Sequence, residues 1–411
     1  MAKQKAIKTK KPQRVLALDI GTRSIVGVLL EKKDETVIRA VEYLEHEARS
    51  MYDGQIHDVE AVAAEIALIK SRLQKATGLK LKKAAVAAAG RALQTATATA
   101  SVSRPHMFEI TWEETKALEL EAVQKAQKKI AGEDKNLRDH FCIGYSVVNY
   151  TLDDGVIQNL VGQTGSKIGV EVIATFLPRV VVDSLISSLR MAGLEAGSLT
   201  LEPIAALTVA IPPQMRLLNL ALVDIGAGTS DIAVVQRETI VAYAMVPVGG
   251  DEITERLAAE YLLDFNTAEK VKRQLSEEEI LTFADVLANR ITEPASAIIE
   301  RIKPTIKELA ASVAREILMT NRKPPDAVIC VGGGSLTPGL LQELAGALEL
   351  PTNRVGIRTR ETLEGIIGEH PALTGPQAVT PLGIGINALA SRPLPLVKVR
   401  VNNHEIPLWG L

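Results

Sequence analysis

Residues 15–30 read VLALDIGTRSIVGVLL, and residues 220–235 read LALVDIGAGTSDIAVV. In each stretch an apolar run reaches Asp-Ile-Gly, bends through Gly and hydroxyl-bearing residues, and resumes as a second apolar run. A charged turn and a third apolar segment follow in both places, at 31–41 and 236–245. Apolar runs separated by Gly-containing bends predict a three-stranded β-meander. The same sequence pattern, a meander opened by an Asp-Ile-Gly bend, occurs twice. This repeat predicts two related domains whose matching loops face each other across a cleft.

A third glycine-rich segment, Gly332-Gly333-Gly334-Ser335, follows an apolar run at 327–331 and precedes a predicted helix that begins near Pro338. Proline is favoured at the first position of a helix, and the free N–H groups there attract anions. Other predicted elements are a helix over 58–78 capped by Asp58, a helix over 112–131, a mostly helical region over 251–320, and a final strand pair at 396–401 and 406–408.

Composition places the chain among ordinary soluble globular proteins. It has 411 residues, 46% of them hydrophobic, and a formal net charge of −2, which argues against a nucleic-acid-binding protein. Aromatic residues make up only 3% of the chain, too few to build stacking platforms for single strands. Cys142 and Cys330 lie in apolar runs and are predicted to be buried free thiols. We find no secretory leader and no membrane-spanning run, which predicts a cytoplasmic protein.

The paired Asp-Ile-Gly bends predict a site for Mg²⁺ and ATP. Asp19 and Asp224 would repel a phosphate by themselves, but they suit a site in which Mg²⁺ is held by one or two carboxylates and by phosphate oxygens. We therefore predict Asp19 and Asp224 as metal ligands. The residues predicted to contact the nucleotide phosphates through backbone N–H groups, hydroxyls or a guanidinium are Gly21, Thr22, Arg23, Ser24, Gly226, Gly228 and Thr229. Taken singly, each bend could instead be a hairpin whose Asp caps its own backbone.

Three further segments complete the predicted site. Gly249 and Gly250 follow a strand and form a candidate phosphate loop, and Gly332, Gly333 and Gly334 form a third. Glu202 precedes Pro203 at a predicted helix start, so we predict Glu202 and Asp224 as the catalytic pair. The alternative for Glu202 is an acid that favours the helix dipole.

These elements, in this order, resemble the actin/hexokinase/heat-shock ATPase superfamily from about Val15 to Ala390. Several segments resemble the bacterial cell-division actin FtsA more narrowly; they are Gly54-Gln55-Ile56-His57-Asp58, Gly90-Arg91, residues 153–159 with Gly162 and Gly165, Ala192-Gly193-Leu194, Leu201-Glu202-Pro203, Val248-Gly249-Gly250 with Thr254, and Pro381-Leu382-Gly383. The resemblance implies an α/β fold with two ribonuclease-H-like cores around a nucleotide cleft, and an FtsA-type 1C lobe.

The resemblance also divides the chain into lobes. It implies a basic tail at 1–13, lobe 1A at 14–84 and 171–201, lobe 1C at 85–170, lobe 2A at 202–250 and 321–390, lobe 2B at 251–320, and a β-extension at 391–411. In the resembled family, such proteins form filaments, bind the tubulin-like division protein FtsZ and reach the membrane through a C-terminal amphipathic helix. Residues 391–411 read as β-strands, so we expect membrane contact here to be indirect or to use a segment beyond them.

The sequence departs from the family at Arg23-Ser24, where many relatives have a small residue followed by Lys, and at Asp251-Glu252, where relatives often have Asn. The predicted function is an ATP-binding division adaptor that forms filaments, with slow hydrolysis at most. The alternatives are a pilus-assembly scaffold of the PilM type and a small-molecule kinase. A chaperone ATPase is disfavoured because only about twenty residues follow the predicted core.

Overall fold

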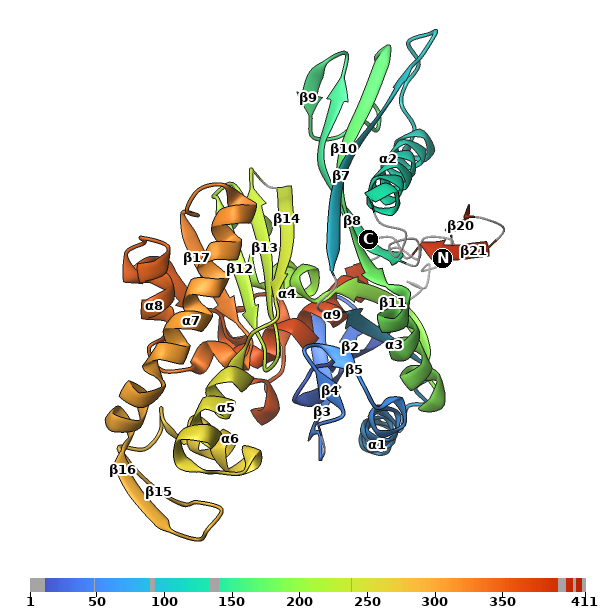
Figure 1. The fold of residues 1–411 in the computed structure, drawn as a ribbon. Helices are drawn as coiled ribbons and strands as arrows, with labels where there is room; N and C mark the ends of the chain where they lie inside the picture. Colours follow the sequence, from blue (N-terminus) through green and yellow to red (C-terminus); the bar gives the residue numbers. More distant parts are fainter. Residues whose placement is uncertain are drawn as a thin grey trace, which may run out of the picture.

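The computed structural model describes residues 12–47, 49–88, 93–133, 140–237, 239–390, 397–401 and 404–408. Most of the predicted basic tail at 1–13, the segment Gly90-Arg91 and the remainder of the predicted extension at 391–411 lie outside these residues. The chain forms two domains side by side, with a third lobe projecting from one end (Figure 1).

The first domain is built on a mixed sheet that grows from the first Asp-Ile-Gly hairpin. β1 pairs antiparallel with β2, and β2 with β3, as the meander predicts, while β6 and β11 add parallel strands beyond β1. In spatial order the strands are β11 (Glu195–Leu201), β6 (Lys83–Ala88), β1 (Gln13–Ile20), β2 (Ser24–Lys32), β3 (Thr36–Glu45) and β19 (Ile366–Ile367). Helices α1 (Val59–Thr77) and α3 (Arg179–Met191) pack against each other in this domain.

The second domain repeats this arrangement. β12 pairs antiparallel with β13 and β13 with β14, while β17 and β18 continue in parallel beyond β12. The strands, in spatial order, are β14 (Thr239–Val246), β13 (Ser230–Gln236), β12 (Leu220–Ile225), β17 (Ala327–Val331) and β18 (Val355–Ile357). Apart from β19, which has no counterpart in the second sheet, the order and sense match those of the first sheet, which confirms the predicted duplication of the core.

Two helices join the domains behind the cleft. α4 (Glu202–Ala210) and α9 (Val379–Ala390) pack closely together, and α9 also covers β1 while α4 covers β12 and β13. The close approach depends on Gly383, because an added Cβ there would overlap the Ala205 carbonyl oxygen. Both helices are therefore buried by both domains, and each begins beside the space between the two hairpins.

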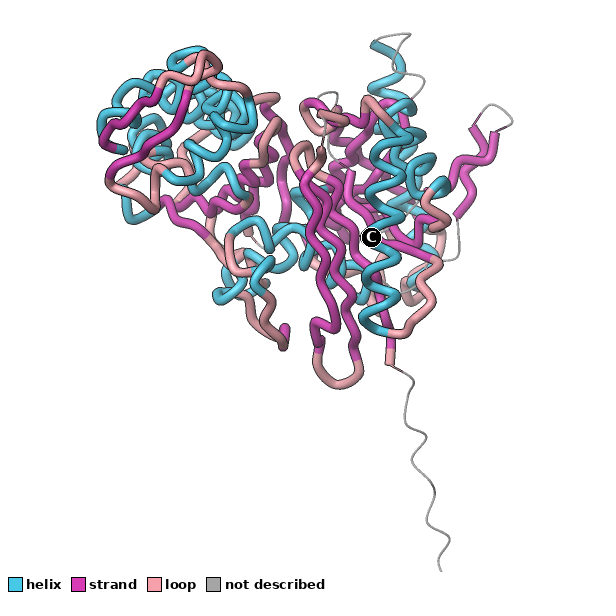
Figure 2. The backbone as a smooth tube through the Cα atoms, turned by 90° about the horizontal axis from the view of Figure 1, so that it is seen from below, coloured by secondary structure: helices cyan, strands magenta, loops and turns pink. Residues whose placement is uncertain are grey.

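The projecting lobe, residues 94–178, is a four-stranded sheet with one helix on it (Figures 1 and 2). Its strands lie in the order β7 (Gln94–Ser103), β10 (Lys167–Pro178), β8 (His140–Leu152) and β9 (Gly155–Ile157), and the helix is α2 (Trp112–Glu133). The helix agrees with the one predicted over 112–131. The sheet begins and ends a few residues beyond the predicted 85–170 boundaries.

A helical lobe extends from the second sheet, at the end of the molecule opposite to the projecting lobe (Figure 1). It contains α5 (Gly250–Tyr261), α6 (Phe265–Gln274), the hairpin β15 (Ile280–Ala284) and β16 (Arg290–Pro294), and α7 (Ala295–Asn321). The helices match the prediction for 251–320, but the hairpin was not predicted, because its two strands have only five residues each and lie within a charged, mostly helical stretch. A short β4 (Met51–Tyr52) and β5 (Gln55–Ile56) hairpin precedes α1 in the first domain.

Several local expectations can now be compared with the structure. Asp58 caps α1 by accepting a hydrogen bond from the Ala61 N–H. Cys142 and Cys330 are buried free thiols, as predicted. The helix predicted from Pro338 was placed too early: a 3-10 turn and a left-handed Gly339 come first, and α8 covers Leu340–Ala347. The predicted terminal strand pair is observed as β20 (Val397–Val401) and β21 (His404–Leu408). Among the described residues, no helix combines the length and apolar character needed to cross a membrane.

Candidate functional site

A large cleft opens between the two domains. Its volume is about 690 Å³, within the usual range for small-molecule sites. The predicted residues that line it are Asp19, Gly21, Thr22, Arg23, Ser24, Glu202, Asp224, Gly226, Thr229, Gly250, Gly332, Gly333 and Gly334. Segments separated by more than 300 residues therefore meet here, as the duplicated core requires.

The two Asp-Ile-Gly hairpins face each other directly. A Cβ added to Gly228 would lie 3.2 Å from the Thr22 Oγ1 atom and 3.0 Å from the Asp53 backbone. Gly228 itself does not line the cleft, so its role is to let the second hairpin approach the first domain. The contact between the hairpins is the geometric condition on which a shared phosphate site depends.

Some backbone groups predicted to bind phosphate have other partners. The Gly21 N–H donates to the Ser24 carbonyl oxygen at 3.0 Å, and the Gly226 N–H donates to the Thr229 carbonyl oxygen at 2.9 Å. Each of these two amides closes its own hairpin turn, while Gly21 and Gly226 still line the cleft, so their contact with a phosphate stays a prediction. The Thr22 hydroxyl oxygen accepts from the Gly54 N–H at 3.0 Å, and the Thr229 hydroxyl donates to Asp231 at 3.2 Å.

The predicted Gly249–Gly250 phosphate loop also needs correction. The Gly249 N–H donates to the Glu252 carboxylate at 2.7 Å, and the Gly250 N–H donates to the Gly226 carbonyl oxygen at 3.0 Å. A Cβ on Gly249 would lie 2.5 Å from the Ala227 carbonyl oxygen. This loop therefore supports the second hairpin from behind, and only Gly250 reaches the cleft.

Three carboxyl groups, those of Asp19, Glu202 and Asp224, line the cleft, and Asp231 is buried close to them. Burial and the neighbouring Asp224 raise the pKa of Asp19 to about 7, and the same two causes raise the pKa of Asp231 to about 7. Burial also raises the pKa of Asp224 itself. Burial, followed by the charges of Asp231, Asp19 and Asp224, raises the pKa of Glu202 well above its usual value. The charge of Asp224 hinders the ionisation of Asp19, Asp231 and Glu202, so the site favours a bound cation.

The position of Asp224 is fixed from two sides. One carboxylate oxygen accepts a hydrogen bond from the Thr380 hydroxyl at the start of α9. Gly332, at a φ of +79°, lies against the other oxygen, and a Cβ there would overlap it. A left-handed glycine between β17 and the 3-10 turn is therefore required for Asp224 to keep its place.

A magnesium ion and a polyphosphate fit this set of groups. Asp231 Oδ1 is buried and has no hydrogen-bond partner, which is costly for an anion unless a cation compensates it. Among the described residues, no three or more His, Cys, Asp or Glu side chains are arranged to hold a metal by themselves. Mg²⁺ usually takes only one or two protein carboxylates and completes its shell with water and phosphate, so this observation agrees with Asp19 and Asp224 as ligands of a nucleotide-bound ion.

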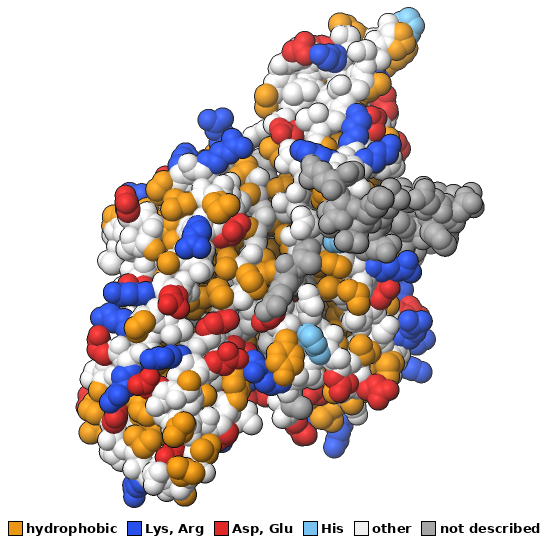
Figure 3. Space-filling model, in the orientation of Figure 1, with side chains coloured by type: hydrophobic (Ala, Val, Ile, Leu, Met, Phe, Trp, Pro, Cys, Tyr) orange, Lys and Arg blue, Asp and Glu red, His pale blue; other side chains and the backbone are white. Residues whose placement is uncertain are grey.

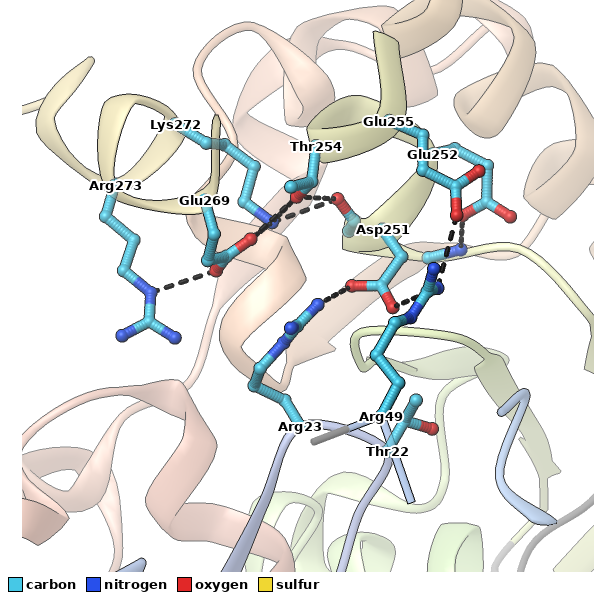
Figure 4. Close-up of polar contacts among 12 residues, drawn as sticks. Thr22, Arg23, Arg49, Asp251, Glu252, Thr254, Glu255, Glu269, Lys272 and Arg273 are labelled. Atoms are coloured by element: carbon cyan, nitrogen blue, oxygen red, sulfur yellow. Dashed lines mark hydrogen bonds and ion pairs between the residues drawn. The ribbon is translucent and has the colours of Figure 1, made fainter. Parts of the chain in front are cut away.

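Basic and acidic side chains from the helical lobe form the other wall of the cleft (Figure 4). Lys272 is largely buried and donates to the Gly250 carbonyl oxygen at 2.9 Å and to the Thr254 hydroxyl at 2.8 Å. It also pairs with Glu269 at 2.7 Å, and burial lowers its pKa. Lys272, Glu269 and Arg273 line the cleft.

The sequence did not single out several of these residues. Asp231 directly follows the turn of the second hairpin, in β13, and its closeness to that turn could have marked it as a candidate site residue. Thr380, Glu269 and Lys272 lie in helices with no motif around them, so only the folded chain brings them to the cleft. Arg23 was predicted to contact phosphate, and it lines the cleft, but its guanidinium pairs with Asp251.

Comparisons with known proteins agree with this architecture. A sequence model of the family described as "Cell division protein FtsA" matches residues 221–383. The FtsA protein of Bacillus subtilis is 23% identical over 372 residues, covering 85% of this chain and 81% of the relative. Matches of this kind extend beyond the second domain to most of the chain.

Two solved structures share the fold. The structure described as the "PilM-PilN type IV pilus biogenesis complex" matches with a TM-score of 0.68 and 18% identity, covering 92% of this chain and 99% of the other. The ethanolamine utilization protein EutJ from Carboxydothermus hydrogenoformans matches with a TM-score of 0.53 and 19% identity, covering 92% of both chains. At such low identity these matches establish the fold alone.

The duplicated sheets, the facing hairpins and these similarities lead to one assignment. The chain has the fold of the actin-like ATPase superfamily, and its sequence is similar to the cell-division protein FtsA.

Proposed function

We propose that this protein binds Mg²⁺–ATP in the cleft between its two domains. The observation that carries the proposal is the convergence of Asp19, Asp224 and Glu202 beneath two hairpins that touch each other. Asp19 and Asp224 would hold the ion through its waters or directly. The bound ion would supply charge neutralisation to the phosphates, the main requirement for phosphoryl transfer.

The residues around this acid cluster have separate roles in the proposal. Thr380 and Gly332 fix the carboxylate of Asp224. Glu202, at the first turn of α4, carries a raised pKa and can accept or orient a proton at its carboxylate oxygen. A group with this property can position an attacking water, but no second substrate pocket accompanies it among the described residues. Slow hydrolysis therefore fits better than a kinase activity on a small molecule.

Isothermal titration calorimetry tests the binding site. The wild-type protein should bind ATP in the presence of Mg²⁺ and lose most of its affinity in EDTA. Asp224→Asn keeps an acceptor for Thr380 but removes the charge, so it should abolish the Mg²⁺-dependent part of binding. Asp34→Asn, in the exposed turn after β2, is the matched control. Unchanged Mg²⁺–ATP affinity in Asp224→Asn would contradict the site assignment.

We further propose that the nucleotide controls assembly of the protein as a division adaptor. The FtsA relatives support this role, and the shape of the molecule is compatible with end-to-end contacts. Exposed apolar side chains lie at both ends: Met107 and Phe108 are 67% and 65% exposed in the projecting lobe, and Val286 and Leu287 are 64% and 72% exposed at the β15–β16 turn. Figure 3 shows hydrophobic side chains at the tip of the projecting lobe and at the opposite end, over this hairpin.

Sedimentation tests the assembly proposal. Protein with Mg²⁺–ATP should pellet as filaments, and Phe108→Asp or Leu287→Asp should leave it in the supernatant. A second arm adds purified FtsZ filaments and measures co-pelleting, since FtsZ is the partner that the family resemblance implies. Failure to pellet with FtsZ, together with binding to a peptide of a membrane partner, would favour a PilM-like scaffold instead. The similarity to the PilM–PilN structure, with a TM-score of 0.68, is the reason to test the PilM-like scaffold as a second candidate.

A further inference from the structure

Arg23 is the residue of the first hairpin whose contacts the proposed function does not explain. It lies between Thr22 and Ser24 and lines the cleft, yet its guanidinium points across to the other domain (Figure 4). There Nη2 pairs with the carboxylate of Asp251 in α5. The same guanidinium lies 4.5 Å from the ring centroid of Phe265 in α6. Arg23 therefore links the hairpin to the helical lobe by charge and by a cation–π contact.

A second arginine reinforces this link. Arg49, in the segment after β3, lies 3.6 Å from Asp251 and 3.2 Å from Glu255. Its guanidinium is also 4.5 Å from the Phe265 centroid and 4.7 Å from that of Tyr52. Asp251 thus has two cationic partners from the first domain, and would keep one of them if Arg23 left.

The environment of Arg23 favours replacement of its partner Asp251 by a phosphate. Its side chain is 19% exposed and that of Asp251 is 8% exposed, so the pair is largely shielded from water. The Nε atom of Arg23 is buried and has no hydrogen-bond partner. A guanidinium recognises phosphate best through two parallel N–H donors, and here one donor of that fork is unsatisfied. A triphosphate entering the cleft would offer several oxygens and more negative charge than Asp251 does.

We propose that Arg23 and Asp251 form a latch across the cleft that polyphosphate releases: the guanidinium binds either Asp251 or a phosphate of the nucleotide. This inference rests on the proposed ATP site and specifies how occupancy would be communicated. In the latched arrangement the first hairpin is tied to α5, which starts directly behind the second hairpin. When Arg23 turns to phosphate, α5 retains only Arg49, and the mouth of the cleft loosens on that side.

Because Asp251 and phosphate compete for Arg23, removing the charge of Asp251 should increase the affinity for ATP, not decrease it. Asp251→Asn removes the competing carboxylate and frees Arg23, so ATP affinity should increase by about fivefold, the lower end of ordinary site-to-site coupling. Arg23→Gln should weaken ATP binding. In an Arg23→Gln background, Asp251→Asn should have no effect, because no guanidinium remains to be released. Glu255→Gln, which removes an exposed partner of Arg49 only, is the matched control and should leave affinity unchanged.

A second experiment tests the latch by measuring the distance between the domains, not the affinity for ATP. Spin labels at Glu47→Cys and Lys270→Cys, exposed positions on opposite sides of the mouth, report the distance between the domains, while the two buried native cysteines remain unlabelled. In protein without nucleotide, Asp251→Asn should lengthen or broaden this distance relative to wild type. Mg²⁺–ATP should do the same in wild type and add little in Asp251→Asn.

The possible outcomes separate this inference from the proposed function. If wild type binds no ATP by calorimetry, the proposed function fails and phosphate exchange at Arg23 fails with it. If wild type binds ATP but Asp251→Asn leaves affinity unchanged, or tightens it equally without Arg23, the ATP site stands and the latch is refuted. A fivefold gain that requires Arg23, with a longer distance between labels, supports the latch.

Discussion

Removing the charge of Asp224 should stabilise the ligand-free protein while destroying its function. Asp224 is a cause of the raised pKa of Asp19 and of Asp231, each about 7. For an acid whose folded-state pKa exceeds its unfolded value, the folded state retains the proton longer. The free energy of unfolding therefore falls as pH rises from about 4 to about 7.

The size of the effect follows from these values. A shift of about 3 pKa units at one site corresponds to about 4 kcal/mol of lost stability above pH 7. Burial is the larger cause for both acids and Asp224 the smaller one. We therefore expect Asp224→Asn to increase the free energy of unfolding by about 1–3 kcal/mol at pH 8, and by close to nothing at about pH 2, where these acids are protonated in both states.

Urea unfolding at a series of pH values measures this prediction, with Asp34→Asn as the control for an exposed carboxylate. Adding Mg²⁺–ATP should raise the stability of wild type by mass action and leave Asp224→Asn unchanged. The reasoning would be refuted if Asp224→Asn were less stable than wild type at pH 8, or if its gain were the same at every pH. Either result would mean that Asp224 is a structural cap, not part of a repulsive acid cluster.

Two other predictions concern single positions. Gly332→Ala should lower the free energy of unfolding by about 1–3 kcal/mol, because the residue has a positive φ and its Cβ would overlap Asp224. It should also weaken Mg²⁺–ATP binding measured by calorimetry. Binding at wild-type affinity would show that Asp224 does not need a glycine at this position. Asp58→Ala should cost about 1 kcal/mol in urea unfolding through loss of the α1 cap, without changing nucleotide affinity; an affinity change would mean that α1 is coupled to the cleft.

Much of the fold could be predicted from the sequence because its signals are local. The alternation of apolar runs with Gly-containing bends predicted both meanders, and Asp58 with Gly78 marked both ends of α1. The errors have local causes too. Gly339 adopts a left-handed conformation that delays α8 to Leu340, and the β15–β16 hairpin has strands of only five residues each within a charged, mostly helical stretch.

The site could be predicted only in part. Asp19, Asp224 and Glu202 were recognisable because a turn or a helix start marks each of them. Lys272 and Thr380 carry no such mark, since nothing in a helix sequence tells which residue will meet a loop elsewhere in the chain: Lys272 contacts Gly250, 22 positions away, and Thr380 contacts Asp224, 156 positions away. That the amides of Gly21 and Gly226 close their own turns could not be predicted for a related reason, because whether a turn closes on itself depends on its final geometry.

By itself, the sequence determined that this chain carries the same acidic hairpin twice, because hydrophobic periodicity and turn chemistry depend on residues close together in the chain. Only the tertiary structure decided that the hairpins touch, that Asp224 lies between Thr380 and Gly332, and that Arg23 pairs with Asp251. Those contacts join residues up to 228 positions apart. They depend on how the two sheets pack around α4 and α9, which no local pattern specifies.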